Sequence, residues 1–95
     1  MMRTITIDGE LDAARVETLR GTLDDIAADN SDLDIDMSGC TFLDSSGIGA
    51  IVFVYKRKLA RGYKVRLSGL AAQPQKLLRH LGIASLLSDN GRSAA

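Results

Sequence analysis

Strand-like and helix-like patterns alternate along this chain of 95 residues, and the alternation restricts it to the α/β class of folds. Alternating polar and apolar residues predict short strands at 3–7, 33–37 and 64–67. Apolar residues at helical spacing predict a helix between Asp12 and Asp29 and a second helix from about Ser46 to Gly62. Right-handed crossovers would join neighbouring parallel strands. We therefore predict a small single α/β domain with a mixed or parallel sheet and helices packed on it.

Local signals set the expected ends of the elements. Asp8-Gly9 is typical of a turn after the first strand, and residues 38–43 are expected to form a connection after the second. Gly62 would close the second helix. Pro74 suits the first turn of a third helix that runs to Gly82, and residues 83–87 could add one more turn.

The stretch Ile51–Tyr55 is rich in β-branched and aromatic residues, so propensity alone would also allow a strand. We predict a helix because the segment up to Gly62 is longer than a usual strand. One helical face would then carry the apolar residues Ile48, Ile51, Val52, Tyr55 and Leu59. Across the chain, the expected core includes Leu19, Ile26, Ile35, Val52, Val65 and Leu78.

The composition describes one globular domain over residues 1–95, with an ordered core at about 3–88 and a flexible tail at 89–95. Hydrophobic residues make up 45% and charged residues 25% of the chain, as in ordinary globular proteins. No apolar run reaches the roughly 18 residues of a membrane span, and no signal peptide is evident. Cys40 is the single cysteine, which excludes an internal disulfide and fits a reducing compartment. We therefore expect a cytoplasmic protein.

The formal net charge of zero hides an uneven distribution. Residues 1–50 hold eleven acidic and three basic side chains, whereas residues 51–95 hold nine basic and one acidic. We expect the two halves to interleave in the fold, so that opposite charges meet. Direct binding of nucleic acid is not expected, because acidic groups would lie close to any basic patch and aromatic residues are only 4% of the chain.

The segment Asp44–Gly49, Asp-Ser-Ser-Gly-Ile-Gly, carries the strongest functional signal. A carboxylate precedes two hydroxyl residues, and two glycines leave the adjacent backbone bare. This is the layout of a helix N-terminus that presents a serine to a partner. An anion on that serine would be tolerated there, because a helix N-terminus has unpaired N–H groups and a partial positive charge. The same residues are also ordinary capping residues, so the string by itself describes a helix start.

The other polar residues give no catalytic or metal site. His80 is the single histidine, and a lone helix histidine without a nearby nucleophile is typical of a surface or capping residue. Cys40 is expected to be a buried, inert thiol. No phosphate-binding loop ending in Gly-Lys-Ser/Thr is present, so no cofactor is expected.

Carboxylates near the motif leave one alternative open. Asp34 and Asp36 alternate along a strand, which is typical of a solvated face. Asp36, near the expected end of its strand, could nevertheless lie close to Ser45. Together with Asp12 and Asp44 it could orient the hydroxyl or bind Mg²⁺ delivered with a kinase's ATP.

Several segments, in order, resemble the STAS domain of the anti-sigma factor antagonist family. They are Gly9–Asp12, Leu33–Met37, Phe42–Gly49, Gly62 before a strand, and Leu77–Ile83, and together they cover most of the chain. In that family an anti-sigma factor kinase phosphorylates the residue directly after the Asp of the central motif. That position here is Ser45. Ser46 is similar to the second hydroxyl position, which is seldom the acceptor.

The resemblance implies a non-enzymatic switch with no catalytic residues. The surface around unphosphorylated Ser45 would bind an anti-sigma factor, a serine kinase of the GHKL type, and so free a sigma factor. Phosphorylation of Ser45 would weaken this binding, and a PP2C-type phosphatase would restore it. The partner-binding residues expected around Ser45 are Asp12, Asp36, Asp44, Ser46, Gly47, Ile48 and Gly49, with Ile48 as an exposed anchor one turn further on.

A second role remains open. Family members usually begin with an extra edge strand, and this chain starts almost at the next one. The sheet is therefore expected to be smaller, or to have an uncovered edge that allows self-association or pairing with another chain. Short STAS proteins also serve as subunits of lipid-transporting ATPase complexes. In that alternative the protein would regulate a membrane ABC transporter, and Ser45 would be only a helix cap.

Overall fold

A computed structural model describes residues 2–81, and the elements follow the expected alternation of strands and helices. They are β1 (Met2–Leu11), α1 (Ala13–Ala28), β2 (Asp32–Leu43), α2 (Ser45–Ala60), β3 (Val65–Ser68) and α3 (Ala72–His80). Within these residues, no helix has the length and apolar character needed to cross a membrane. The extra turn expected at 83–87 and the tail expected at 89–95 lie outside the described residues.

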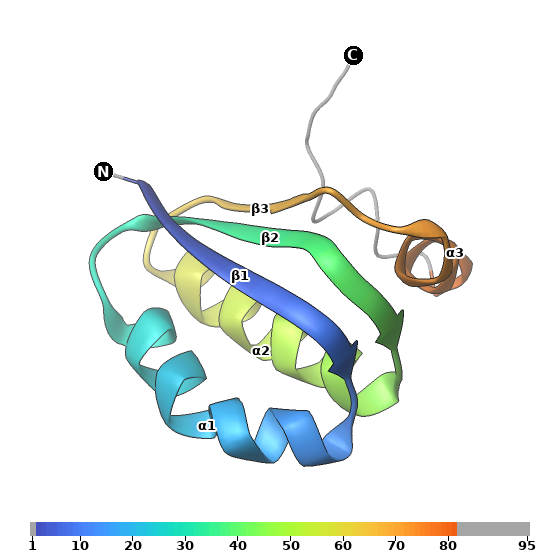
Figure 1. Cartoon of the computed structure of the whole chain (residues 1–95). Helices are drawn as coiled ribbons and strands as arrows, with labels where there is room; N and C mark the ends of the chain where they lie inside the picture. Colours follow the sequence, from blue (N-terminus) through green and yellow to red (C-terminus); the bar gives the residue numbers. More distant parts are fainter. Residues whose placement is uncertain (1, 82–95) are drawn as a thin grey trace.

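The strands form one parallel sheet with the order β1-β2-β3. Figure 1 shows α1 and α2 side by side on one face of this sheet, while α3 lies near the end of β2. The first strand of the chain is an edge strand of the described sheet. The small α/β domain with helices packed on a sheet is confirmed, and its strand pairs are parallel because each crossover passes through a helix.

Aspartate residues start both long helices, and a glycine follows the second one. Asp12 accepts a hydrogen bond from the N–H of Arg15 at 3.0 Å, and Asp44 accepts one from the N–H of Gly47 at 3.0 Å. Gly62 has φ of 85°, the left-handed conformation that commonly ends a helix. The sequence-based prediction of the Asp12 cap and of the Gly62 stop is confirmed.

β1 and β2 run past their expected ends. The predicted turn at Asp8-Gly9 and the predicted connection at 38–43 are wrong, because these two segments pair with each other as strands. Register shifts between Thr6 and Asp8, and between Gly9 and Glu10, absorb the extra residues of β2. Gly9 has φ of 72°, which glycine adopts without strain. Each segment supplies the backbone hydrogen-bonding partners of the other, and this overrides their turn propensity.

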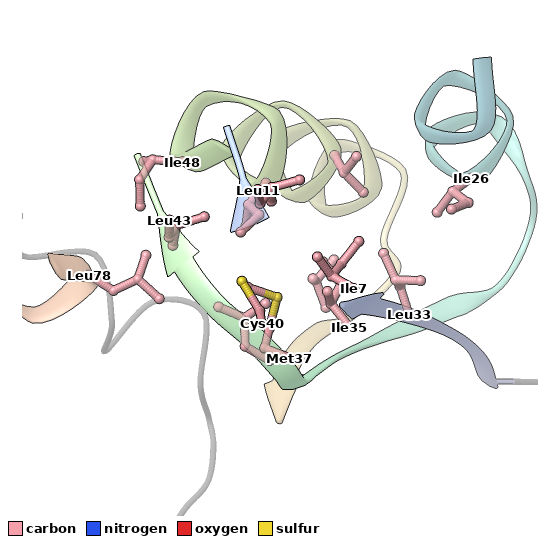
Figure 2. Packing of buried hydrophobic residues seen from close by; sticks show 14 residues of the cluster. Ile7, Leu11, Ile26, Leu33, Ile35, Met37, Cys40, Leu43, Ile48 and Leu78 are labelled. Atoms are coloured by element: carbon pink, nitrogen blue, oxygen red, sulfur yellow. The ribbon is translucent and has the colours of Figure 1, made fainter. Parts of the chain in front are cut away.

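The core lies between the sheet and the two long helices, with Leu78 of α3 closing it near the end of β2 (Figure 2). Four of the expected core residues are buried: Ile26, Ile35, Val65 and Leu78. Leu19 and Val52 are only partly buried and pack against the margin of the core. Cys40 is buried among these residues, but in β2 and not in a loop.

α2 is helical through Ile51–Tyr55, as predicted, and the predicted apolar face is buried at Ile48 and Ile51 but not along its whole length. Leu59, the last residue of that apolar face, is 55% exposed. Ile48 is only 8% exposed, so the prediction of an exposed anchor at this position is wrong. The buried residues of α2 are Gly47, Ile48, Ile51, Val54 and Lys58.

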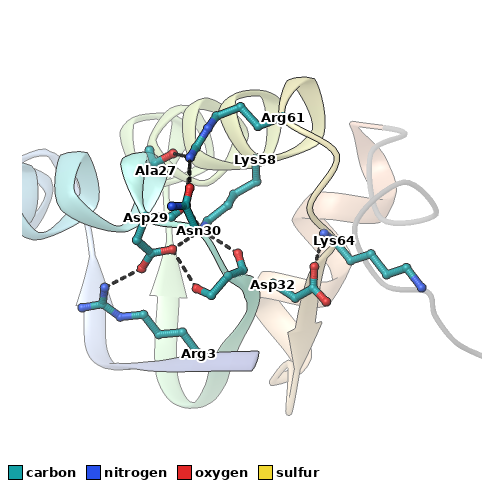
Figure 3. A network of polar contacts seen from close by, with 9 residues as sticks. Arg3, Ala27, Asp29, Asn30, Asp32, Lys58, Arg61 and Lys64 are labelled. Carbon is teal, nitrogen blue, oxygen red and sulfur yellow. Dashed lines mark hydrogen bonds and ion pairs between the residues drawn. The ribbon is translucent and has the colours of Figure 1, made fainter. Parts of the chain in front are cut away.

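Lys58 is fully buried because the turn between α1 and β2 satisfies its ammonium group. Its Nζ donates to the carbonyls of Asp29 at 3.1 Å and Ser31 at 2.7 Å, and it forms an ion pair with the Asp29 carboxylate. Asp29 also pairs with Arg3 at 2.6 Å (Figure 3). Arg61 donates to backbone carbonyls at the end of α1. The acidic first half and the basic second half of the chain therefore interleave here, as expected.

This network predicts an acid-sensitive contribution to stability. The Lys58 ammonium, aided by hydrogen bonds from Ser31 and Arg3, holds the pKa of the Asp29 carboxyl well below its usual range. A carboxyl with a lowered folded pKa stabilises the fold above its unfolded pKa and loses that contribution as the pH falls. At pH 7, Asp29→Asn should lower the free energy of unfolding by about 3 kcal/mol, because it leaves a buried ammonium without its counter-ion.

Urea unfolding followed by circular dichroism at several pH values measures this effect. Between about pH 5 and pH 2 the wild-type free energy of unfolding should fall more steeply than that of Asp29→Asn, so the two curves converge. Asp25→Asn, which changes an exposed carboxylate in the last turn of α1, is the matched control and should follow the wild type. Parallel curves for the wild type and Asp29→Asn would contradict the assigned role of the pair.

Candidate functional site

The carboxyl ends of β1 and β2 bring the beginnings of α1 and α2 together. Leu11 and Leu43 are paired across the two strands, and the N–H of Asp44 donates to the carbonyl of Leu11 at 3.4 Å. A capping aspartate, Asp12 or Asp44, follows each strand at once. Two helix N-termini with partial positive charge and two carboxylates therefore share one edge of the sheet.

Ser45 is the first residue of α2 and is exposed at this edge. The helix is capped by Asp44, so the alternative prediction that Ser45 serves as the cap is wrong. Within residues 2–81 no hydrogen bond engages the Ser45 hydroxyl, whereas Asp44 accepts the N–H of Gly47. Ser46 is half-buried. Of the two motif hydroxyls, the one at Ser45 is therefore the more accessible.

The two glycines of the motif have different environments. A Cβ atom at Gly47 would lie 2.7 Å from a methyl carbon of Leu43 and would also collide with the carbonyl oxygen of Leu11. The absence of a side chain lets the first turn of α2 lie directly on the ends of the strands. Gly49 is exposed, and a Cβ atom there would meet open space. Gly47 and Ile48 thus face inwards, and Gly49 faces the surroundings.

A side chain of α3 holds the last residue of β2. The amide group of Gln73 accepts a hydrogen bond from the N–H of Leu43 at 2.9 Å and donates one to its carbonyl at 3.0 Å. This paired contact takes the place of a neighbouring strand, because β3 pairs with β2 only as far as Asp36. α3 is therefore linked directly to the residue before the Asp44 cap. No pattern in the sequence marks Gln73 as a site residue, and its only signal is its place beside Pro74 at a helix start.

Asp36 does not lie at this edge, so the expected proximity to Ser45 is wrong. Its neighbours in the sheet are Thr6 and Ser68, and the rest of β2 separates it from the motif by about 20 Å at about 3.3 Å per residue. The N–H of Ser38 donates to its carboxylate at 3.0 Å and lowers its pKa. Between residues 2 and 81 no group of three or more His, Cys, Asp or Glu residues could hold a metal ion.

Cys40 and His80 fit the ordinary roles expected of them. The buried thiol of Cys40 donates to the carbonyl of Phe42 at 3.3 Å and has no access to solvent. His80 is the exposed last residue of α3.

Exposed aromatic residues and a groove lie on the segments next to Ser45 in sequence. Phe42, two residues before Asp44, is 41% exposed. Phe53 lies about two turns further along α2, and the Arg57 guanidinium stacks over its ring at 5.0 Å. A groove of about 290 Å³ between α1 and α2 is lined by Val16, Arg20, Leu23, Asp24, Gly49, Ala50 and Phe53. Exposed aromatic side chains beside a partly apolar groove are typical of protein docking surfaces.

Comparison with known proteins identifies the family. A family model described as "Mlab, STAS domain" matches residues 2–88. The chain belongs to the STAS domain family. The anti-sigma-B factor antagonist of Bacillus subtilis (strain 168) is 26% identical to this STAS domain over 89 residues, which are 94% of this chain and 82% of that protein.

Solved structures show the same STAS fold. A sulfate transporter family protein from Wolinella succinogenes has a TM-score of 0.78 at 22% identity, covering 98% of this chain and 75% of that one. The anti-sigma factor antagonist SpoIIAA in its unphosphorylated form has a TM-score of 0.70 at 18% identity, covering 99% and 78%. The STAS domain of a SulP transporter from Vibrio cholerae has a TM-score of 0.71 at 21% identity, covering 99% and 73%.

The two motif glycines give a matched pair of substitutions. Gly47→Ala should lower the free energy of unfolding by about 1–3 kcal/mol, because its methyl group has no room beside Leu11 and Leu43. Gly49→Ala should be neutral or stabilising by up to about 1 kcal/mol, because alanine favours an exposed helix interior. Thermal unfolding of both variants measures the difference. Equal effects at the two positions would show that α2 does not approach the strands as closely as described.

The Gln73 contact predicts a local effect on the end of β2. Gln73→Leu should cost about 1–3 kcal/mol and speed hydrogen exchange at the Leu43 amide, because both backbone groups lose their partner. Gln75→Leu, an exposed glutamine on the same helix, is the matched control and should leave this amide unchanged. Unchanged exchange at Leu43 in Gln73→Leu would contradict the contact.

Proposed function

We propose that this STAS domain is an anti-sigma factor antagonist, a non-enzymatic cytoplasmic module whose binding is switched by phosphorylation of Ser45. The observation that carries the proposal is the position of Ser45, exposed directly after the Asp44 cap and free of hydrogen bonds to residues 2–81. A hydroxyl that does not stabilise the fold can be modified without unfolding it. The relationship to the anti-sigma-B factor antagonist of Bacillus subtilis supports the same role.

The proposed docking surface has two parts. One is the edge of the sheet where α1 and α2 begin and Ser45 is exposed, called here the Ser45 edge. The other is the groove between α1 and α2, which begins one turn further along α2. Its polar members are Asp12, Asp44, Ser45 and Ser46, and its exposed aromatic members are Phe42 and Phe53. In many protein complexes, aromatic side chains that become buried on docking, with polar groups around them, supply most of the affinity. Asp36 and Ile48 are left out, because the first lies far along β2 and the second is buried. The partner would be a GHKL-type serine kinase that acts as the anti-sigma factor.

Electrostatic repulsion explains why phosphorylation of Ser45 would weaken docking. A phosphate on Ser45 adds a charge of about −1.5 to −2 next to Asp44 and close to Asp12. In the free protein, water and the helix N-termini offset the resulting repulsion. At a docked interface water is excluded, so the dianion is costly unless the partner supplies cations. Phosphorylation would therefore weaken docking without a change of fold, and removal of the phosphate by a PP2C-type phosphatase would restore it.

A second candidate function is a subunit that regulates a membrane ABC transporter for lipids. The observation in its favour is the description of the matching family as "Mlab, STAS domain". In this role the Ser45 edge would dock permanently on the ATPase subunit, and Ser45 would stay unmodified. Copurification from the native cell separates the two roles, because one partner is a kinase and the other a membrane ATPase.

Phosphorylation by the cognate kinase tests the first role. Incubation with the kinase and ATP should add one phosphate to the peptide that contains Asp44-Ser45-Ser46. Ser45→Ala should abolish the modification and Ser46→Ala should keep it, since Ser45 carries the accessible hydroxyl. Peptide mass spectrometry measures both. Ser45→Ala should still bind the kinase, and Ser45→Asp should bind it more weakly because it adds negative charge at the interface.

Two outcomes would count against the switch. A phosphate that persists in Ser45→Ala would move the site to another residue. Intact protein from the native cell that carries no phosphate in growing or stressed cultures, together with a copurifying membrane ATPase, would favour the transporter role.

A further inference from the structure

A second groove lies at the other end of α2 from Ser45. It has a volume of about 350 Å³ and is lined by Met2, Leu33, Tyr55, Leu59, Lys64, Val65 and Arg66. Leu59 is separated from Ser45 by about 20 Å along the helix axis, at 1.5 Å per residue. This amino-end groove is therefore distinct from the surface assigned to phosphorylation and kinase binding.

The amino-end groove exposes large apolar side chains. Met2 is 48% and Leu59 is 55% exposed, and the buried Leu33 and Val65 lie beneath them. Figure 1 shows why they meet: the C-terminal half of α2 passes under the beginnings of the strands. Apolar side chains gathered in one exposed groove, with polar residues around them, mark an interaction site more often than a free surface.

The rim of the groove carries two exposed cationic side chains, Lys64 and Arg66. The backbone N–H of Lys64 donates to the Asp32 carboxylate at 2.8 Å, whereas its side chain points away from that network (Figure 3). The Lys64 ammonium forms no ion pair with any residue in 2–81. Arg66 is exposed and holds Asp34 only at 3.4 Å. Asp34 shares its charge with Arg66, whereas the Lys64 ammonium points away from Asp32, so Lys64 is the rim cation that an incoming carboxylate can reach first.

The geometry favours a helix over an added strand as the occupant. β3, which borders the groove, has four residues, and such short edge strands are poor templates for pairing. An amphipathic helix instead places apolar residues one turn apart into a groove and keeps charged residues at its margins. We propose that the amino-end groove binds an acidic amphipathic helix of a partner protein. Its apolar face would pack on Met2 and Leu59, and its carboxylates would pair with Lys64 and Arg66.

This binding would be independent of the state of Ser45, so the domain could hold two partners at opposite ends of α2. The test uses the full chain, labelled with ¹⁵N, and a synthetic helical peptide with leucine on one face and glutamate on the other. Nuclear magnetic resonance titration should give saturable shifts at Met2, Leu59, Lys64 and Arg66. A peptide with lysine in place of glutamate should bind at least about tenfold more weakly, because it meets a cationic rim.

Variants assign the binding to the groove. Leu59→Glu should weaken the glutamate peptide at least about tenfold, since it removes an apolar anchor and adds a repelling charge. Phe53→Glu adds the same charge at an exposed position of the same helix outside the groove, and it should stay within about twofold of the wild type. Lys64→Glu, also at an exposed position, is a second groove variant that tests the rim if Leu59→Glu loses its fold by circular dichroism.

Four results would overturn the proposal. Saturable binding could be absent, or the two peptides could bind equally, which would remove the role of the cationic rim. The shifts could instead lie in the groove between α1 and α2. Finally, vesicles containing phosphatidylglycerol could bind through Leu59 and Lys64 while the glutamate peptide does not, which would make the groove a lipid site.

Discussion

The pairing of the last residues of β1 with the last residues of β2 is the constraint on which the functional edge depends. Two register shifts, each with an extra residue in β2, bring Leu11 opposite Leu43, and this register places the two capping aspartates next to each other. Gly47 then allows the first turn of α2 to rest on the strand ends, where any side chain would collide. Ser45 is exposed because its neighbours are fixed: Asp44 caps the helix, and Gly47 and Ile48 lie against the strands.

The two ends of α2 are held by different physical means. At its start, a carboxylate cap and a glycine contact leave the outer surface free for modification. At its end, the buried ammonium of Lys58 is bound by Asp29 and by the turn after α1, and this contact sets which face of the helix is buried. The same rotation leaves Leu59 exposed beside Lys64. An arrangement that buries one charged side chain therefore also creates the apolar, cation-rimmed groove proposed as a second docking site.

Much of the fold could be predicted from local patterns, and the misses have a common cause. Strand and helix order, the Asp12 cap and the Gly62 stop depend on residues close in sequence, so they could be predicted. The lengths of β1 and β2 depend on pairing between segments about 30 residues apart, and such pairing overrode the turn signal of Asp8-Gly9. In the candidate site, Ser45 and Asp44 could be named from the motif. The burial of Ile48 could not be predicted, because it depends on the rotation of α2 against the sheet.

The sequence by itself determined the class of fold, the family resemblance and the serine that follows the cap, because these depend on spacing within short segments. Only the tertiary structure decided that Gly47 and Gly49 have opposite environments, that Gln73 of α3 holds Leu43, and that Asp36 is remote from Ser45. It also decided that Lys58 is buried while Leu59 is exposed, although lysine is usually exposed and leucine usually buried. The physical reason is that burial of a lysine depends on carbonyl and carboxylate groups supplied by a distant turn, and no local pattern of residues records where those groups will lie.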